Sequence, residues 1–160
     1  MDRLFAPWRG AYVTGEAAVA SEGCVMCRAG SGDPSSAALV IHRSGLNVVL
    51  MNLFPYSSGH TMVAPLRHVG SLDAASEAEL ADMMSLARRL ERVLGVLYRP
   101  DGINLGMNLG RAAGAGIADH IHLHAVPRWV GDTNFMTVVG ETRVVPEDPR
   151  VAAEKLRDHF

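Results

Sequence analysis

Apolar residues gather in several short runs along the sequence. Three such runs span residues 38–42, 46–51 and 60–64, with turn-forming residues between them. These runs predict a hairpin followed by a third strand. Residues 103–109 predict a fourth strand and residues 121–126 a fifth, and the fifth alternates strictly between apolar and polar positions, as a strand with two different faces does.

A longer period of about 3.6 residues begins at Ser76. Ser76 and Glu79 form a capping-box pattern, which is typical of a helix N-terminus. Pro100-Asp101-Gly102 then ends the segment. The pattern therefore predicts one long helix whose leucine and methionine face covers the sheet or contacts a partner. The apolar positions that define this face are Leu80, Met83, Met84, Ala87, Leu90, Leu94 and Leu97.

The two periods together predict an α+β fold with a five-stranded, mostly antiparallel sheet, one long helix and a C-terminal helix. A length of 160 residues suits a single domain with its own core, spanning residues 1–160. Residues 1–36 are expected to form an N-terminal arm that ends in a loop rich in glycine and serine. Residues 37–146 form the core and residues 147–160 the C-terminal helix.

The composition excludes several classes of protein. Hydrophobic residues make up 48% of the chain and charged residues 20%, which is typical of a globular domain and not of a disordered one. A net charge of -2 does not favour a nucleic-acid partner. No apolar run approaches the ~20 residues of a membrane-spanning helix, and residues 1–9 lack the apolar core of a signal peptide. We therefore expect a cytoplasmic protein without a membrane partner.

Three of the seven histidines occupy alternate positions in and immediately before the fifth predicted strand, in the order His120-Ile121-His122-Leu123-His124. Alternate residues of a strand share a face, so the three imidazoles would lie about ~7 Å apart in a row. Histidines in such a row can bind a metal, act as acid and base, or serve as a nucleophile. The strict alternation argues against a chance run of solvated histidines and leaves a metal-binding triad as the main competitor to a catalytic one.

A loop of small residues directly precedes the histidine strand. Residues 110–116 contain three glycines and three alanines. Small residues let backbone N–H groups approach an anion closely. The position of the loop beside the histidines favours a phosphate-binding loop over a plain connection.

The sequence has two cysteines, Cys24 and Cys27, in a C-x-x-C pattern. In a reducing compartment this spacing indicates metal or redox chemistry more often than a structural disulfide. A structural zinc site would require two further ligands. The alternative is a pair of reduced cysteines that bind no metal.

The pattern His120-x-His122-x-His124, with apolar residues between and after, resembles the histidine-triad (HIT) family of nucleotide hydrolases and transferases. The resemblance covers residues 5–146, nearly the whole chain. Several segments resemble the branch of the family that acts on diadenosine polyphosphates. The similar segments are Trp8-Arg9, Leu50-Met51-Asn52, Gly59-His60, Ala64-Pro65, Pro127-Arg128-Trp129 and Gly131-Asp132-Thr133-Asn134-Phe135.

The resemblance implies a HIT-like fold and a role for each matching residue. His122, the middle histidine, would be the nucleophile that attacks the α-phosphorus, and His124 would donate a hydrogen bond to a phosphate oxygen. Asn108 matches a position whose amide reaches the phosphate region. Asn52 matches the position that contacts the ribose hydroxyls, although the residue alone is equally consistent with a turn ahead of Pro55.

The resemblance also implies a structural zinc ion and a dimer. Relatives with an N-terminal C-x-x-C use a histidine after the third strand and the first histidine of the triad as the other two ligands. Here the set would be Cys24, Cys27, His68 and His120. Members of the family usually form a homodimer whose sheets join across the two-fold axis, so we expect a homodimer here.

The expected function is cleavage of a nucleoside polyphosphate, with a dinucleoside polyphosphate favoured, at the α-phosphate through a covalent nucleotidyl-His122. An adenine nucleotide is the expected substrate. Three alternatives stay open: a phosphorylase that uses inorganic phosphate, a nucleoside phosphoramidate hydrolase, and a non-catalytic, zinc-containing nucleotide-binding module.

The chain departs from the family pattern at Ala115-Gly116-Ile117, where many members have a glutamine or serine near a phosphate oxygen. Backbone N–H groups from Gly114 to Gly116 would substitute for that side chain. A phosphate acceptor needs positive or hydrogen-bonding neighbours, and Arg111 is the nearest cation in the sequence. Water needs no such help, so we expect hydrolysis rather than phosphorolysis.

Overall fold

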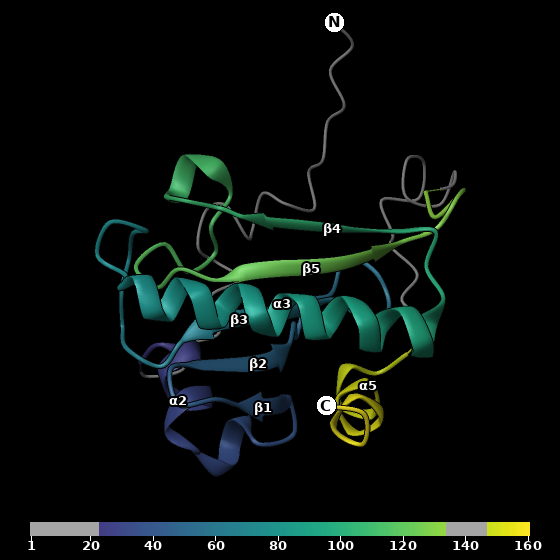
Figure 1. The fold of residues 1–160 in the computed structure, drawn as a ribbon, viewed down its shortest axis with the longest axis horizontal. Helices are drawn as coiled ribbons and strands as arrows, with labels where there is room; N and C mark the ends of the chain where they lie inside the picture. Colours follow the sequence, from purple (N-terminus) through teal and green to yellow (C-terminus); the bar gives the residue numbers. More distant parts are fainter. Residues whose placement is uncertain (1–22, 134–146) are drawn as a thin grey trace, which may run out of the picture.

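The computed structural model describes residues 23–133 and 147–160 (Figure 1). The predicted segments Trp8-Arg9 and Asn134-Phe135 lie outside these described residues. In chain order the described elements are α2 (Val25–Ser31), the 3-10 turn η2 (Pro34–Ser36), β1 (Val40–Arg43), β2 (Asn47–Met51), β3 (Thr61–Pro65), α3 (Glu77–Tyr98), β4 (Gly102–Met107), the 3-10 turn η3 (Arg111–Ala113), β5 (Leu123–Arg128) and α5 (Pro149–Arg157).

The five strands form one antiparallel sheet in the order β1-β2-β3-β5-β4. Helix α3 runs across one face of the sheet, and α5 packs beside β1 and β2 (Figure 1). The predicted α+β fold, with its long helix and its C-terminal helix, is confirmed. None of the helices in the two described segments is both long and apolar enough to cross a membrane.

Alternation along the strands divides the core between the two faces of the sheet. Val49, Val63 and Leu123 point toward α3 and pack with its fully buried Leu90. Val48, Leu50, Met62 and Ala64 point to the opposite face and pack on Met26 and Ala29 of α2. Met62 is the partner of His124 in the register of β3 and β5, so His124 lies on the α2 face of the sheet.

Helix α3 begins as its sequence predicts. The Ser76 hydroxyl accepts a hydrogen bond from the Glu79 N–H, and the Glu79 carboxylate accepts one from the Ser76 N–H. Arg99, with φ of 45°, ends the helix in the left-handed region before Pro100. Most of the predicted apolar face is buried against the sheet, whereas the Met84 side chain points to solvent. The face therefore covers the sheet, which is the first of the two roles expected for it.

Two local features differ from the sequence prediction. Helix α2 lies within the segment predicted as an arm, and it includes Gly30, which the pattern had placed in a loop. Strand β5 begins at Leu123, so His122 precedes the strand instead of lying in it. The backbone before β5 bonds to the loop after β3, because the Ile121 N–H donates a hydrogen bond to the Val69 carbonyl.

Candidate active site and metal site

His122 and His124 form a buried pair on the α2 face of the sheet, where β5 begins. Their ring centroids lie 4.8 Å apart in an edge-to-face arrangement. This is closer than the spacing of about ~7 Å that an ideal strand gives, because His122 lies just outside the strand. The two side chains are nearly inaccessible, with 5% and 9% of their residue surfaces exposed.

A hydrogen bond to a backbone carbonyl defines the tautomer of His122. Its Nδ1 lies 2.9 Å from the carbonyl oxygen of His120. A carbonyl oxygen can only accept, so Nδ1 carries the proton and donates it. The lone pair of the neutral ring is therefore on Nε2, which is the atom that a nucleophilic role requires.

His60 is a functional candidate that the sequence prediction did not include. This fully buried residue precedes β3, and its Nε2 lies 2.9 Å from Nδ1 of His124. The backbone N–H of Tyr56 donates to Nδ1 of His60 at 3.0 Å, so the His60 proton is on Nε2. His60 therefore donates to Nδ1 of His124 and leaves the His124 proton on Nε2, where it can be donated to a substrate oxygen.

Burial keeps both histidines of the pair neutral. Burial, together with a smaller effect of the neighbouring His122, lowers the pKa of His124 to about 4. Burial also lowers the pKa of His122, against the opposing effect of the hydrogen bond to the His120 carbonyl. A neutral imidazole is the nucleophilic form, so the arrangement is suited to covalent catalysis near neutral pH.

Asn52 lies beside His60, directly after β2. Its Oδ1 accepts a hydrogen bond from the Phe54 N–H at 3.0 Å, and its Nδ2 is 3.5 Å from both ring nitrogens of His60. Asn52 is thus a turn residue and a neighbour of the histidine cluster at once. The two interpretations of this residue are compatible.

The small-residue loop before the histidines is held together by its own hydrogen bonds. The Asn108 amide lies 3.5 Å from the Gly114 carbonyl oxygen, to which it donates. The Gly114 N–H donates to the Arg111 carbonyl, and the Ala115 N–H donates to the Gly110 carbonyl. Of the three N–H groups from Gly114 to Gly116 that were expected to face phosphate, two are engaged within the loop, which leaves that of Gly116.

Four side chains with metal-binding atoms converge at the other end of the same face. Cys24 immediately precedes α2 and Cys27 lies in its first turn, whereas His68 follows β3 and His120 precedes β5. The four ligand atoms lie within 4.8 Å of one another. Sγ of Cys24 is 3.3 Å from Nδ1 of His120, and Sγ of Cys27 is 3.3 Å from Nδ1 of His68.

The donor set and its geometry fit a tetrahedral zinc ion. Zinc bonds of about 2.3 Å to sulfur and 2.0–2.1 Å to nitrogen place neighbouring ligand atoms roughly 3.5 Å apart. Nε2 of His120 lies 2.9 Å from the Pro65 carbonyl oxygen and donates to it, so the lone pair of His120 is on Nδ1, which faces the sulfurs. His120 also accepts the hydrogen bond from His122 through its carbonyl, and it thereby connects the metal site to the histidine pair.

The five-stranded antiparallel sheet, with His120, His122 and His124 at the start of β5, has the features of a histidine-triad fold. The family model described as "HIT domain" matches residues 34–130, and the chain belongs to this family. A "ZN-bound histidine triad family protein" from Mycobacterium smegmatis has a similar structure, with a TM-score of 0.69 and 30% identity over 86% of this chain and 92% of the other.

Two curated relatives are named as a phosphorylase and a tetraphosphatase. The "AP-4-A phosphorylase" of Mycobacterium tuberculosis is 43% identical over 109 residues, which are 68% of this chain and 56% of the relative. The asymmetrical "Bis(5'-nucleosyl)-tetraphosphatase" of Schizosaccharomyces pombe is 31% identical over 93 residues, 58% of this chain and 50% of the relative. The matched region therefore spans about half of the length of these two relatives.

Proposed function

We propose that the protein cleaves a dinucleoside polyphosphate at the α-phosphate by transfer of a nucleotidyl group to His122. The observation that supports this most is the hydrogen bond from His122 Nδ1 to the His120 carbonyl, because it keeps the Nε2 lone pair available. Nε2 forms a bond to the α-phosphorus, and the bond from phosphorus to the bridging oxygen breaks. The Nε2 proton of His124 stabilises a phosphate oxygen during this step.

A second step returns the nucleotidyl group to an acceptor and regenerates His122. With water as acceptor the product is a nucleoside monophosphate, and with inorganic phosphate it is a nucleoside diphosphate. The sequence prediction favours water. The 43% identity to a relative named AP-4-A phosphorylase favours phosphate instead, so phosphorolysis is the second candidate function.

We propose that zinc occupies the Cys24, Cys27, His68 and His120 site. All four tetrahedral positions would be filled by protein atoms, as in structural sites. When bound, the ion would cross-link α2 to the segments after β3 and before β5. His120 would then be fixed as a ligand, and its carbonyl would hold the His122 ring in position through the hydrogen bond to Nδ1.

The remaining proposals concern substrate, assembly and location. An adenine base is proposed for the substrate, in line with the names of the relatives. We propose a homodimer whose sheets join across a two-fold axis, which is supported by β4 lying at an edge of the sheet with mostly exposed residues. Asn52, Asn108 and the Gly116 N–H are proposed to contact substrate, and the cytoplasm is the proposed compartment.

Product analysis on diadenosine tetraphosphate, with and without inorganic phosphate, tests the proposed function. Asymmetric hydrolysis gives AMP and ATP, symmetric hydrolysis gives two ADP, and phosphorolysis gives ADP and ATP. The symmetric outcome would contradict attack at the α-phosphate. No turnover of any dinucleoside polyphosphate, together with tight nucleotide binding, would favour the non-catalytic binding module. Turnover of a nucleoside phosphoramidate alone would favour that hydrolase class.

A further inference from the structure

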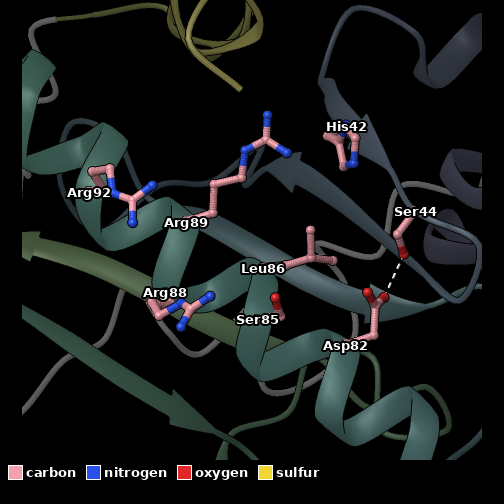
Figure 2. A pocket seen from close by; sticks show the side chains of 8 residues that line it. All are labelled: His42, Ser44, Asp82, Ser85, Leu86, Arg88, Arg89 and Arg92. Atoms are coloured by element: carbon pink, nitrogen blue, oxygen red, sulfur yellow. Dashed lines mark hydrogen bonds between the residues drawn. The ribbon is translucent and has the colours of Figure 1, made fainter.

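A polar pocket lies between α3 and β1, on the face of the sheet opposite the histidine pair. It has a volume of about 300 Å³. Figure 2 shows Arg89 extending from α3 toward His42 on β1, above Leu86. The lining side chains are His42, Ser44, Asp82, Ser85, Leu86, Arg88, Arg89 and Arg92.

The pocket is lined by three arginines and a single carboxylate, so positive charge is in excess. Within residues 23–133 and 147–160, the guanidinium groups of Arg88, Arg89 and Arg92 form neither an ion pair nor a hydrogen bond. The one carboxylate of the pocket, Asp82, is already engaged by the Ser44 hydroxyl at 2.5 Å and by the Asn47 amide at 2.7 Å. This excess of positive charge occurs in a chain with a net charge of -2.

Two local features hold basic side chains at the pocket. The register between β1 and β2 shifts between Val40 and His42, which is a β-bulge. Ile41 packs in the core under α3, and His42 also lines the pocket beside α3, so the bulge directs two successive side chains to the same face. The Arg89 guanidinium carbon lies 4.4 Å from the centre of the Phe160 ring, and this cation–π contact fixes its position.

We propose that this pocket binds a phosphate or pyrophosphate group, either free or as the phosphate chain of a nucleotide. The planar guanidinium fork matches phosphate oxygens in a bidentate manner, and the Ser85 hydroxyl lies at the same pocket. The volume is at the small end of the range for ligand pockets. Leu86 is its only apolar lining residue, so the pocket offers phosphate contacts but little surface on which a base could pack.

This site is separate from the histidine pair. His42 lies on the face with Val49 and α3, whereas His124 lies on the face with Met62 and α2. The sheet stands between them, so an anion in the arginine pocket cannot be the phosphate that His122 attacks. The proposal therefore does not depend on the proposed enzymatic activity.

Titration calorimetry of the full chain with pyrophosphate tests the site, with an NMR titration of the His42 resonance as a second measurement. We expect Arg89→Gln combined with Arg92→Gln to weaken binding by at least about tenfold, since each lost charge-assisted hydrogen bond has an effect of that order. Arg89→Lys keeps the charge but loses the fork, and should weaken binding to a smaller extent. Arg150→Gln, on the exposed first turn of α5, is the control that removes a positive charge away from the pocket and should have no effect.

The outcomes separate this site from the active site. Pyrophosphate binding that persists in His122→Gly and is lost in the arginine double variant supports the proposal. Binding that is lost in His122→Gly and unchanged in the double variant would overturn it, as would the absence of saturable binding. Competition by ADP but not by adenosine would identify a nucleotide phosphate chain as the source, and competition by inorganic phosphate alone would identify the free anion.

Discussion

The hydrogen bond between His60 and His124 can be tested by two substitutions that each preserve one of its ends. In His60→Asn, the side-chain oxygen can replace Nδ1 as acceptor for the Tyr56 N–H, but no donor reaches His124. In His60→Gln, the amide nitrogen can replace Nε2–H as donor to His124, while the Tyr56 N–H loses its acceptor. The pair therefore separates support of the local backbone from control of the His124 tautomer.

The expected magnitude follows from the single hydrogen bond of 2.9 Å between the two rings. A net contribution of about 1–1.5 kcal/mol corresponds to a roughly tenfold preference for the His124 tautomer with its proton on Nε2. Loss of a positioned proton donor lowers catalysis by about 10²–10⁴-fold when the donor is fully lost. Loss of the tautomer preference lowers the fraction of the active tautomer from roughly 90% to roughly 50%, so we expect kcat to fall by about twofold in His60→Asn and by clearly less in His60→Gln.

The assay combines steady-state kinetics on diadenosine tetraphosphate with ¹⁵N NMR of the histidine ring nitrogens, which reports the tautomer of His124 directly. Thermal unfolding controls for loss of structure, because both variants leave one buried polar group without a partner. Equal kcat values in the two variants, with the His124 tautomer unchanged in His60→Asn, would refute the reasoning. So would a larger loss in His60→Gln than in His60→Asn at similar stability.

Two further predictions concern stability. Cys24→Ser should reduce the zinc content from near one ion per chain and lower the Tm by about 5 °C or more, since roughly 2 kcal/mol corresponds to that shift in a domain of this size; an unchanged zinc content by elemental analysis would refute the assigned ligands. The Arg67 guanidinium and the Ser76 N–H lower the pKa of Glu79 from 4.5 to about 2. A lowered pKa stabilises the fold above pH 4.5, and this contribution is lost as the pH falls toward 2, so Glu79→Gln should reduce the Tm at pH 7 and match the wild type near pH 2. A Tm difference that does not depend on pH would contradict this assignment.

The sequence predicts the fold well where one local pattern determines one element. Helix α3 has a complete capping box, a regular apolar face and a proline after its end, and it begins and ends where these signals lie. Helix α2 was not predicted because its seven residues, which end in Ala29, Gly30 and Ser31, carry little periodicity, and packing on the sheet stabilises it instead. The late start of β5 depends on a contact between Ile121 and Val69, which no local pattern shows.

The site is predictable only in part, because local patterns do not show contacts between residues that are far apart in the sequence. The alternation of His120, His122 and His124 is visible in the sequence, and Cys24-x-x-Cys27 is a familiar spacing. His60, by contrast, is 64 positions from the histidine that it contacts, and a histidine after Gly59 resembles any strand residue. The loop at Gly114 illustrates the opposite error, since its glycines are visible but their hydrogen bonds within the loop are not.

Trapping of the covalent intermediate tests the central claim most directly. The protein is mixed with diadenosine tetraphosphate and quenched within milliseconds to seconds, without acid because phosphoramidates are labile, and intact and peptide masses are then measured. We expect an added adenylyl group that maps to His122, and no adduct in His122→Gly, whose fold and nucleotide binding should be retained. An adduct on any other residue, or turnover of His122→Gly at a rate near that of the wild type, would contradict the account.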